Sequence, residues 1–168
     1  MTNRDVSIRR ATAIDLESLS ALIAASYATL DDGSYERAAL AAAMPLMSHA
    51  NPKLVAEGTY YIAEIDSVAA GCGGWSFSAP GTGEKSPGVA HIRHFATDPG
   101  FKRRGVAGRL LRHCLDEARS HGAILMKSQA TLPAEAFYAS FGFRRLAEVR
   151  TNIGGQPLAA IDMELRLE

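Results

Sequence analysis

The chain has 168 residues, of which 47% are hydrophobic and 21% are charged. These values are typical of a globular protein, exclude a chain dominated by disorder, and suit one domain over residues 1–168 better than two. Eighteen basic residues balance 18 acidic ones, so the net charge gives no general attraction to nucleic acid or to a membrane, and we expect neither as a partner.

The start of the chain and its cysteines predict a cytoplasmic protein. Met1 leads directly into polar residues, so we expect no signal peptide. No apolar run approaches the roughly 20 residues that span a bilayer. Cys72 and Cys114 have no paired or C-x-x-C spacing, and we therefore expect two free thiols in a reducing compartment.

The first quarter of the chain predicts a strand followed by helices. We expect a strand at 6–10 and then a helix over about 13–29, because Thr12 and Asp15 resemble a capping box and apolar residues recur at helical spacing. A turn at 31–34 should end this helix.

A second, alanine-rich helix should follow that turn. Ser34 can cap it, and Pro45 should end or kink it. A further short helical turn is expected before Asn51-Pro52.

The middle of the chain predicts a β-hairpin. Strands at 59–65 and 68–77 flank a turn at Asp66-Ser67. Gly71, Gly73 and Gly74 weaken the second strand and predict a bulge or a close backbone approach. A flexible loop rich in glycine and proline follows.

The second half of the chain predicts alternating strands and helices. An apolar, extended run at 89–97 feeds a turn at Asp98-Pro99-Gly100, and an amphipathic helix then opens at Gly105 and ends before Gly122. The later elements are a strand at 123–130, a short helix from Pro133 to Phe141 and a hairpin of 144–152 with 158–167 around Gly154-Gly155. The order β-α-α-β-β-β-α-β-α-β-β predicts an α/β (α+β mixed) fold, with about seven strands in a mixed sheet and helices on both faces.

The turn before the amphipathic helix predicts an anion site. Backbone N–H groups at a helix start bind phosphate when large side chains do not shield them, and the helix dipole adds to this. The alternative is a solvated basic turn before an ordinary helix. The stretch lacks the Gly-Lys-Ser/Thr of a Walker A loop and the third glycine of a dinucleotide fingerprint. The residues concerned are the small Gly105, Ala107 and Gly108 and the basic Lys102, Arg103 and Arg104.

Two motifs resemble those of the GCN5-related N-acetyltransferase (GNAT) superfamily. The run from Lys102 to Ala107 is similar to Q/R-x-x-G-x-G/A between a strand and a helix, and the run from Ala134 to Phe143 looks like A-x-x-x-Y-x-x-x-G-F. The order and spacing of the elements agree along essentially the whole chain. Lys102 departs from the usual Gln or Arg and loses a planar fork of donors, and Thr131 stands where many members have Asn.

The resemblance implies a mainly antiparallel sheet and acetyl-CoA as co-substrate, with the acetyl group transferred by direct attack to a primary amine of a small molecule or peptide. The amides of residues 103–108 would hold the pyrophosphate, and the strand edge at 95–97 would pair with the pantetheine arm. A backbone N–H near Ala96 would stabilise the oxyanion. The implied cofactor-binding residues are Phe95, Ala96, Thr97, Lys102, Arg103, Arg104, Gly105, Val106, Ala107, Gly108, Thr131 and Tyr138.

The transfer needs an acid and a route for the proton of the amine. Tyr138 matches the family tyrosine that protonates the leaving thiolate; the alternative is a packed aromatic ring. His91 stands where some members carry a catalytic glutamate and is the candidate base, with His94 or a water chain as alternatives. Arg93 shares the face of His91, and His94 is offset from it unless a bulge changes the register. No metal is expected, because a strand should place the two histidines on opposite faces.

Selection of the acceptor should come from the first two helices, their loop and the second hairpin strand. Acidic side chains would attract a cationic amine, and Trp75 could stack on it. The alternatives are a helix-ending turn for the two aspartates and plain packing for Trp75. The candidates are Asp31, Asp32, Tyr35, Tyr60 and Trp75.

Other functions remain open to a chain of this kind. It could transfer a longer acyl group, act on an amino-acid derivative, or be a CoA-binding sensor without turnover. Tyr138 favours an enzyme, because binding alone needs no proton donor there. Sheets of this kind often dimerise through their C-terminal hairpins, so a homodimer is one option that the sequence leaves open.

Overall fold

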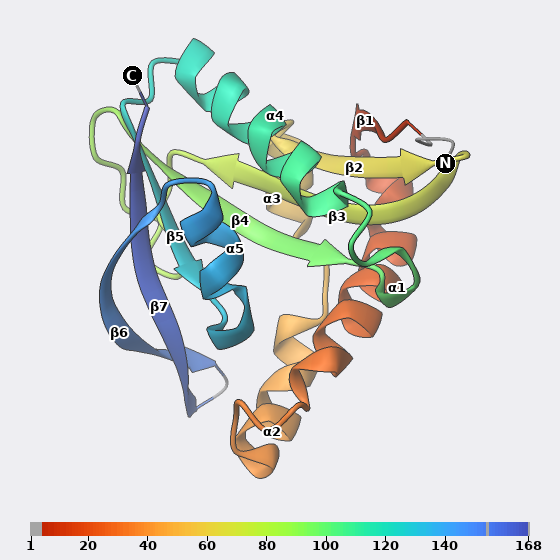
Figure 1. Ribbon diagram of the computed structural model, residues 1–168, viewed down its shortest axis with the longest axis vertical. Coiled ribbons are helices and arrows are strands. Elements are labelled where there is room, and N and C mark those ends of the chain that lie inside the picture. Colours follow the sequence, from red (N-terminus) through yellow and green to blue (C-terminus); the bar gives the residue numbers. More distant parts are fainter. Residues whose placement is uncertain (1–4, 154, 168) are drawn as a thin grey trace.

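Seven strands form one sheet in the computed structural model, in the order β1-β2-β3-β4-β5-β7-β6 (Figure 1). The structure describes residues 5–153 and 155–167. Residues 1–4, on which the prediction of no signal peptide rests, and the turn residue Gly154 lie outside this range. The strands are β1 (Ser7–Arg10), β2 (Tyr60–Ile65), β3 (Val68–Ser76), β4 (Val89–Thr97), β5 (Leu125–Ala130), β6 (Arg144–Ile153) and β7 (Gln156–Arg166).

The described residues form five α-helices, of which four pack on the two faces of this sheet and α2 packs against α1 and the hairpin of β6 and β7. The longer α4 and the short α5 pack on one face over an apolar core, and α1 and α3 pack on the other over a second core (Figure 1). The predicted mixed α/β fold with helices on both faces is therefore confirmed. The helices are α1 (Leu16–Tyr27), α2 (Arg37–Met47), α3 (Pro52–Glu57), α4 (Val106–Ser120) and α5 (Glu135–Ser140).

The first helix forms as predicted. Thr12 and Asp15 make the expected capping box, and the Asp15 carboxylate accepts the Thr12 N–H at 2.8 Å. With its flanking 3-10 turns the helical segment is Ala13–Leu30, 18 residues with a mean hydropathy of 1.2, which is long and apolar enough to cross a membrane. The expectation that no apolar run approaches that length is thus wrong. A helix in the core of a protein can be equally long and apolar, and Leu19 and Ile23 of α1 are buried in the second core.

The predicted cap of the second helix is wrong. Glu36 is the N-cap of α2, while the N–H of Ser34 donates to the Asp32 carboxylate in a separate turn. Pro45 lies inside the last turn, where a missing N–H removes one hydrogen bond, and the helix continues to Met47.

The helical turn expected before Asn51-Pro52 instead follows it as α3. The Asn51 side chain accepts the Lys53 N–H at 3.0 Å, and Pro52 occupies the first helical position. Both residue types favour a helix start, so they mark the beginning of a helix and not its end.

The glycines of β3 confirm the predicted close approach and bulge. A Cβ at Gly71 would lie 2.6 Å from a methyl group of Val106 on α4, and one at Gly73 would clash with the Phe95 ring. Gly73 faces two residues of β4, because Cys72 pairs with Ala96 and Gly74 with Arg93. This places a bulge in β4.

The strands β4 and β5 separate soon after they meet. They are the parallel pair of an otherwise antiparallel sheet among the described residues, and they pair at Val89, Ala90 and His91 with Leu125, Met126 and Lys127. Beyond these positions β4 runs toward β3 and β5 toward β7, which leaves a V-shaped opening in the sheet (Figure 1). Backbone groups on the facing edges therefore lack strand partners.

Candidate functional site

The bulge in β4 brings two neighbouring side chains to one face of the sheet. His94 has a positive φ of 54°, and its ring lies on the α1 and α2 side, 5.6 Å from the ring of Tyr27. Arg93 lines the same cavity as His94. His91, two residues before Arg93, then shares this face, so the argument that the strand separates the two histidines is wrong. Within the described residues no group of three or more His, Cys, Asp or Glu side chains forms a metal site.

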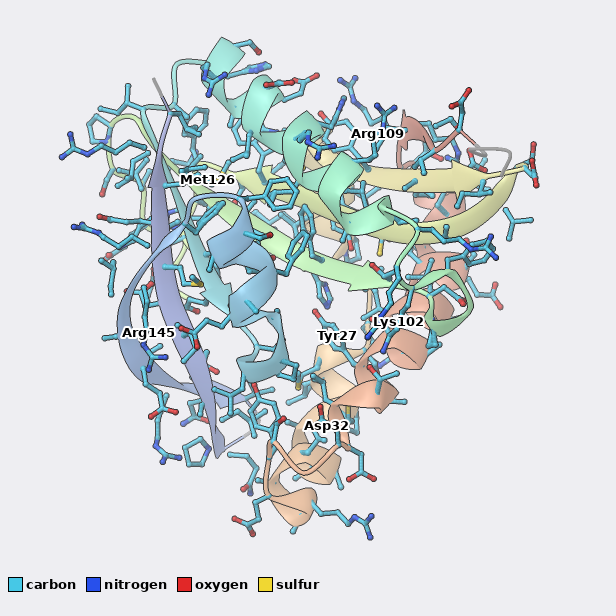
Figure 2. All side chains as sticks on the ribbon, viewed as in Figure 1. Tyr27, Asp32, Lys102, Arg109, Met126 and Arg145 are labelled. Atoms are coloured by element: carbon cyan, nitrogen blue, oxygen red, sulfur yellow. The ribbon has the colours of Figure 1, made fainter. Side chains whose placement is uncertain are left out.

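A cavity of about 270 Å³ occupies the opening between β4 and β5. It is bounded by β4, by the start of α4, by the end of β5 with α5, and by the end of α1. Figure 2 labels two of its lining residues, Lys102 of the loop before α4 and Tyr27 at the end of α1. Seven of the predicted cofactor-binding residues line it: Phe95, Ala96, Thr97, Lys102, Ala107, Thr131 and Tyr138.

The loop at the start of α4 has the backbone shape of an anion site. Arg103 and Gly105 have positive φ angles of 62° and 76°, and Gly105 is the N-cap of α4. The first N–H groups of an α-helix have no intrahelical acceptor, so those of Val106 to Gly108 are free to bind an anion. A Cβ at Gly105 would meet no atom within 4 Å, so the cradle is open there.

The other predicted residues of this loop do not line the cavity. Arg103 and Arg104 are exposed, and the Arg104 guanidinium lies 5.3 Å from the centre of the Phe101 ring. Gly108 has a packing role as well, because a Cβ there would lie 3.1 Å from the Phe141 ring of the segment after α5. The charges around the loop can attract an anion without touching it closely.

Two hydroxyls of α1 contact the backbone edge of β4. The Thr97 N–H donates to Ser26 Oγ at 3.2 Å, and Tyr27 Oη donates to the Phe95 carbonyl at 3.4 Å. These groups belong to the edge that was expected to pair with a pantetheine arm. Ser26 must therefore release the Thr97 N–H before that pairing can form, whereas a carbonyl has a second lone pair to share.

Tyr138 is a buried phenol on the wall of the smaller cavity. It is 5% exposed and contacts the rings of Phe137 and Phe143. Burial raises the pKa of Tyr138, and the neighbouring Ser128 hydroxyl partly opposes that rise. The phenol therefore keeps its proton at neutral pH, as a proton donor must.

The two candidate bases differ in their positions. His94 lines both this cavity and a larger one next to it, whereas His91 lines neither. His94 Nε2 lies 2.8 Å from the Met47 carbonyl. A carbonyl oxygen only accepts, so Nε2 carries a proton, and Nδ1 of the neutral ring is left to accept one.

Both histidines have lowered pKa values. Burial lowers the pKa of His94, the hydrogen bond to Met47 opposes this, and the charge of Arg93 lowers it further. Burial, Lys127 and Arg93 lower the pKa of His91, and Asp162 raises it. His94 is thus neutral above pH 6.5 and can take a proton.

The larger cavity, of about 710 Å³, lies between α2, α3 and the hairpin of β6 and β7. Of the predicted acceptor-binding residues it contains Tyr35, whose hydroxyl donates to the Ala159 carbonyl at 3.0 Å and accepts the Leu132 N–H at 2.9 Å. The two cavities meet at the residues that line both: Tyr27, Ile92, His94, Gln129 and Thr131.

The other four acceptor candidates do not line either cavity. Asp31 is exposed and pairs with Arg37 at 3.5 Å, and Asp32 is exposed beyond the end of α1 (Figure 2). Tyr60 is buried and donates to the His94 carbonyl at 2.8 Å. Trp75 is 1% exposed and packs against Phe77. Tyr60 and Trp75 therefore belong to the cores.

The cysteines do not offer a nucleophile. Both thiols are free and buried. Burial raises the pKa of Cys72 to about 12, and Tyr60 Oη lies 3.2 Å from its sulfur. Cys72 is therefore a protonated core thiol at neutral pH.

The sequence alone did not indicate several lining residues. Tyr27 and Gln129 lie where the cavities meet, and Met47 holds His94 in place. Tyr27 falls on the apolar spacing of α1 and Gln129 on the alternation of β5, so each resembles an ordinary packed or exposed position. Only the separation of β4 from β5 shows that these residues face a cavity.

Comparisons with known proteins agree with this geometry. The family model described as Acetyltransferase (GNAT) family matches residues 24–143. No curated protein matches the sequence. The matched residues include β4, the loop before α4, and Tyr138.

Solved structures share the fold along almost the whole chain. A GCN5-related N-acetyltransferase from Rhodopseudomonas palustris is 20% identical with a TM-score of 0.79, and the match covers 99% of each chain. The PaiA N-acetyltransferase from Thermoplasma acidophilum, in complex with coenzyme A, is 14% identical with a TM-score of 0.71, over 96% of this chain and 99% of that one. The ribosomal-protein-S18-alanine N-acetyltransferase from Escherichia coli is 17% identical with a TM-score of 0.66, over 98% and 95%.

Proposed function

Because this chain belongs to the acetyltransferase (GNAT) family, we propose that it transfers the acetyl group of acetyl-CoA directly to the primary amine of a small molecule or peptide. The observation that carries the proposal is the meeting of two cavities in the opening between β4 and β5, with Tyr138 on the smaller cavity and His94 on both. One cavity suits the coenzyme and the other the acceptor.

The residues around the smaller cavity fit coenzyme A. The free N–H groups at the start of α4 suit its pyrophosphate, and Lys102, Arg103 and Arg104 lie around them. The edge of β4 from Phe95 to Thr97 offers backbone groups to an extended arm. The solved PaiA structure, which contains coenzyme A, has the same fold.

The chemistry requires one bond to form and one to break. The amine nitrogen attacks the thioester carbon, the C–N bond forms, and the C–S bond breaks with the electron pair on sulfur. Tyr138 supplies the proton for this sulfur. The nitrogen loses a further proton as the amide forms, and this proton, carried by water, restores the phenol. Burial raises the basicity of a thiolate as well as that of a phenolate, so the transfer does not require Tyr138 to be a strong acid.

The proton of the amine goes to His94 in this proposal. A lysine-like amine has a pKa of about 10.4 and is mostly protonated at neutral pH, so it must lose a proton before it attacks. His94 lines both cavities and has Nδ1 available, whereas His91 and a water chain remain the alternatives. Neither cysteine is suited to form an acetyl-enzyme, which supports direct attack.

A binding measurement and a mass measurement test the proposal together. Acetyl-CoA should raise the melting temperature, since a ligand that binds only the folded state stabilises it. Intact-mass analysis of the protein after incubation with acetyl-CoA alone should show no covalent acetyl group. No melting shift at saturating acetyl-CoA would contradict the coenzyme site, and a thioester on a cysteine would contradict direct attack.

A further inference from the structure

The larger cavity carries positive charge and no negative charge from its lining residues. Arg93 lines it and is charged at neutral pH, and among the described residues no aspartate or glutamate lines it. The acidic side chains that were expected to attract a cationic amine, Asp31 and Asp32, lie outside it. A site for a simple cationic amine would have the opposite sign.

Arg93 is held in place with one edge unused. Its Nη1 donates to Ser76 Oγ at 2.9 Å and to the Ser78 carbonyl at 3.3 Å. Ser76 is itself buried and donates to the same carbonyl at 2.7 Å. Among the described residues Arg93 makes no ion pair, and its Nε and Nη2 make no hydrogen bond.

This free edge has the shape that a carboxylate needs. Nε and Nη2 donate two parallel hydrogen bonds, which a carboxylate accepts in a bidentate pair. Burial lowers the pKa of Arg93 and the exposed Glu57 opposes that, but an arginine stays protonated at physiological pH. Because the guanidinium is half-buried, a bound carboxylate would be partly shielded from water.

The bulge of β4 places this cation next to the reaction centre. Arg93 and His94 are adjacent and line the same cavity, and His94 also lines the coenzyme cavity. An acceptor whose carboxylate binds Arg93 must therefore have its amine only a short distance from that carboxylate. A free amino acid meets this condition, whereas a peptide separates its terminal amine from its terminal carboxylate.

The rest of the cavity favours an apolar side chain. Leu46, Met47 and Leu54 line it on the helix side, and Ile153 and Leu158 on the hairpin side. A cavity of about 710 Å³ is within the range of sites for small molecules. We infer that the acceptor is a free amino acid with an apolar side chain, whose carboxylate is bound by Arg93. This inference rests on the proposed function and narrows its acceptor.

Matched acceptors test the inference. We compare L-phenylalanine with 2-phenylethylamine and L-phenylalaninamide, and L-leucine with 3-methylbutylamine, by acetyl-CoA-dependent thiol release. The wild type should have a kcat/KM about 10- to 100-fold higher for each amino acid than for its matched amine, since hydrogen bonds to a charged group are of that strength. L-phenylalaninamide controls for the basicity of the amine. It lacks the carboxylate, but its amine is less basic than that of 2-phenylethylamine.

Variants of Arg93 assign the preference to one side chain. Arg93→Gln should abolish the preference, because kcat/KM should fall far more for the amino acids than for the matched amines. Arg93→Lys, which keeps the charge without the fork, should fall in between. Arg150→Gln, which removes a charge from an exposed position of β6 outside the cavity, should retain the preference.

The outcomes separate this inference from the proposed function. If the amines or short peptides are acetylated as well as the amino acids, or if Arg93→Gln retains the preference, the inference is wrong while acetyl transfer stands. If no acceptor is acetylated, binding of L-phenylalanine to the CoA-loaded protein by calorimetry decides. If the wild type binds L-phenylalanine and Arg93→Gln does not, the inference is supported even though no turnover is seen. If the wild type does not bind L-phenylalanine, the inference is wrong. The melting shift with acetyl-CoA, unchanged in all variants, shows that they fold.

Discussion

At the scale of single residues, Tyr138 has the most direct part in the proposed chemistry. It is buried, it lines the smaller cavity, and burial raises its pKa so that the phenol remains protonated. The same ring packs against Phe137 and Phe143, and packing alone would give it no catalytic role.

Tyr138→Phe separates these two roles because it removes only the hydroxyl. We expect kcat to fall about 10²- to 10⁴-fold, with the affinity for acetyl-CoA changed by less than about threefold. Steady-state kinetics and calorimetry give the two values. Tyr61→Phe is the control, since Tyr61 is also buried but lies outside both cavities. An unchanged kcat in Tyr138→Phe would leave Tyr138 as a packing residue.

His94 should act through its neutral form. Its pKa lies below 6.5, mainly because of burial, so the acidic limb of the pH profile should begin below pH 6.5. Below that pKa, log kcat/KM should fall with a slope of about two per pH unit, one from His94 and one from the amine.

Substitution of each histidine distinguishes the two candidate bases. His94→Gln keeps a donor for the Met47 carbonyl, and we expect a loss of about 10²- to 10⁴-fold in kcat/KM and a slope of one. His91→Gln should keep the wild-type slope. The reverse pattern would assign the base to His91, and two unchanged profiles would favour a water chain.

At the scale of elements, the start of α4 and the separation of β4 from β5 define the site together. The helix supplies unpaired N–H groups, and the opening supplies the space into which an extended ligand can run. Either feature alone occurs in many folds. Their coincidence supports the proposal that the loop of 102–105 binds the coenzyme.

The two ends of α4 offer a matched pair of substitutions. Gly105 and Gly122 both have positive φ, 76° and 93°, and a Cβ at either would meet no atom within 4 Å. A glutamate causes similar backbone strain and adds the same charge at both positions. We expect Gly105→Glu to weaken acetyl-CoA binding by more than about 100-fold, because a carboxylate would occupy the anion site.

Gly122→Glu, at the opposite end of the helix, should retain nearly wild-type affinity. Calorimetry with acetyl-CoA measures both variants. If both variants bind acetyl-CoA with wild-type affinity, there is no anion site at the start of α4. If both lose affinity to the same extent, the loss comes from backbone strain and not from the added charge.

The start of α1 provides a prediction about stability. Arg9 on β1 binds the Asp15 carboxylate at 2.8 Å, and chiefly this hydrogen bond, with a smaller contribution from the Thr12 N–H, lowers the pKa of Asp15 from 3.8 to about 2. A lowered pKa contributes stability that is present above 3.8 and is lost as the pH falls toward 2. Arg9 is 44% exposed, so after screening by solvent we expect about 1 kcal/mol.

Asp15→Asn should therefore lower the free energy of unfolding by about 1 kcal/mol at neutral pH, and the difference should narrow below pH 3.8. Urea denaturation at several pH values measures it. Asp116→Asn is the control, since that carboxylate is exposed and 3.8 Å from Arg119. A difference that does not depend on pH would mean that the ion pair contributes nothing.

The elements also show what the sequence could and could not indicate. Alternation, capping and glycine positions predicted every strand and the helices α1, α4 and α5 closely, because these signals are local. The start of α3 was misplaced because Asn51-Pro52 was taken as an end when both residues favour a beginning. The glycines of β3 predicted a bulge, but not that it would turn His94 to the face of Arg93, since that depends on the register with β4.

At the scale of the whole molecule, the proposed acceptor site is assembled from parts that are far apart in the sequence. Residues of α2, α3, β4, β5 and the hairpin of β6 and β7 line the larger cavity. No single motif in the sequence describes such a surface. This is why two motifs led to seven residues that line the smaller cavity, whereas Tyr60 and Trp75 were assigned to the acceptor and are in the cores.

The sheet itself links the two halves of the proposed site. The strands on the β1 side carry the start of α4 and the coenzyme edge of β4, while β5, β6 and β7 carry Gln129, Thr131 and the hairpin wall. The short pairing of β4 with β5 holds the halves together at one end only. The two cavities therefore belong to one opening, and a single transfer between them needs no large movement of either half.

The most direct measurement of the central claim is the stoichiometry of transfer. Wild-type protein is incubated with acetyl-CoA and L-phenylalanine, and the CoA thiol and the acetylated amine are both quantified by mass spectrometry. We predict equal amounts of the two products. Gly122→Glu should still form both products, and Gly105→Glu should form neither. Tight binding of acetyl-CoA with no amine-dependent release of CoA thiol, for this or any other amine tried, would contradict the account and indicate a coenzyme-binding module without turnover.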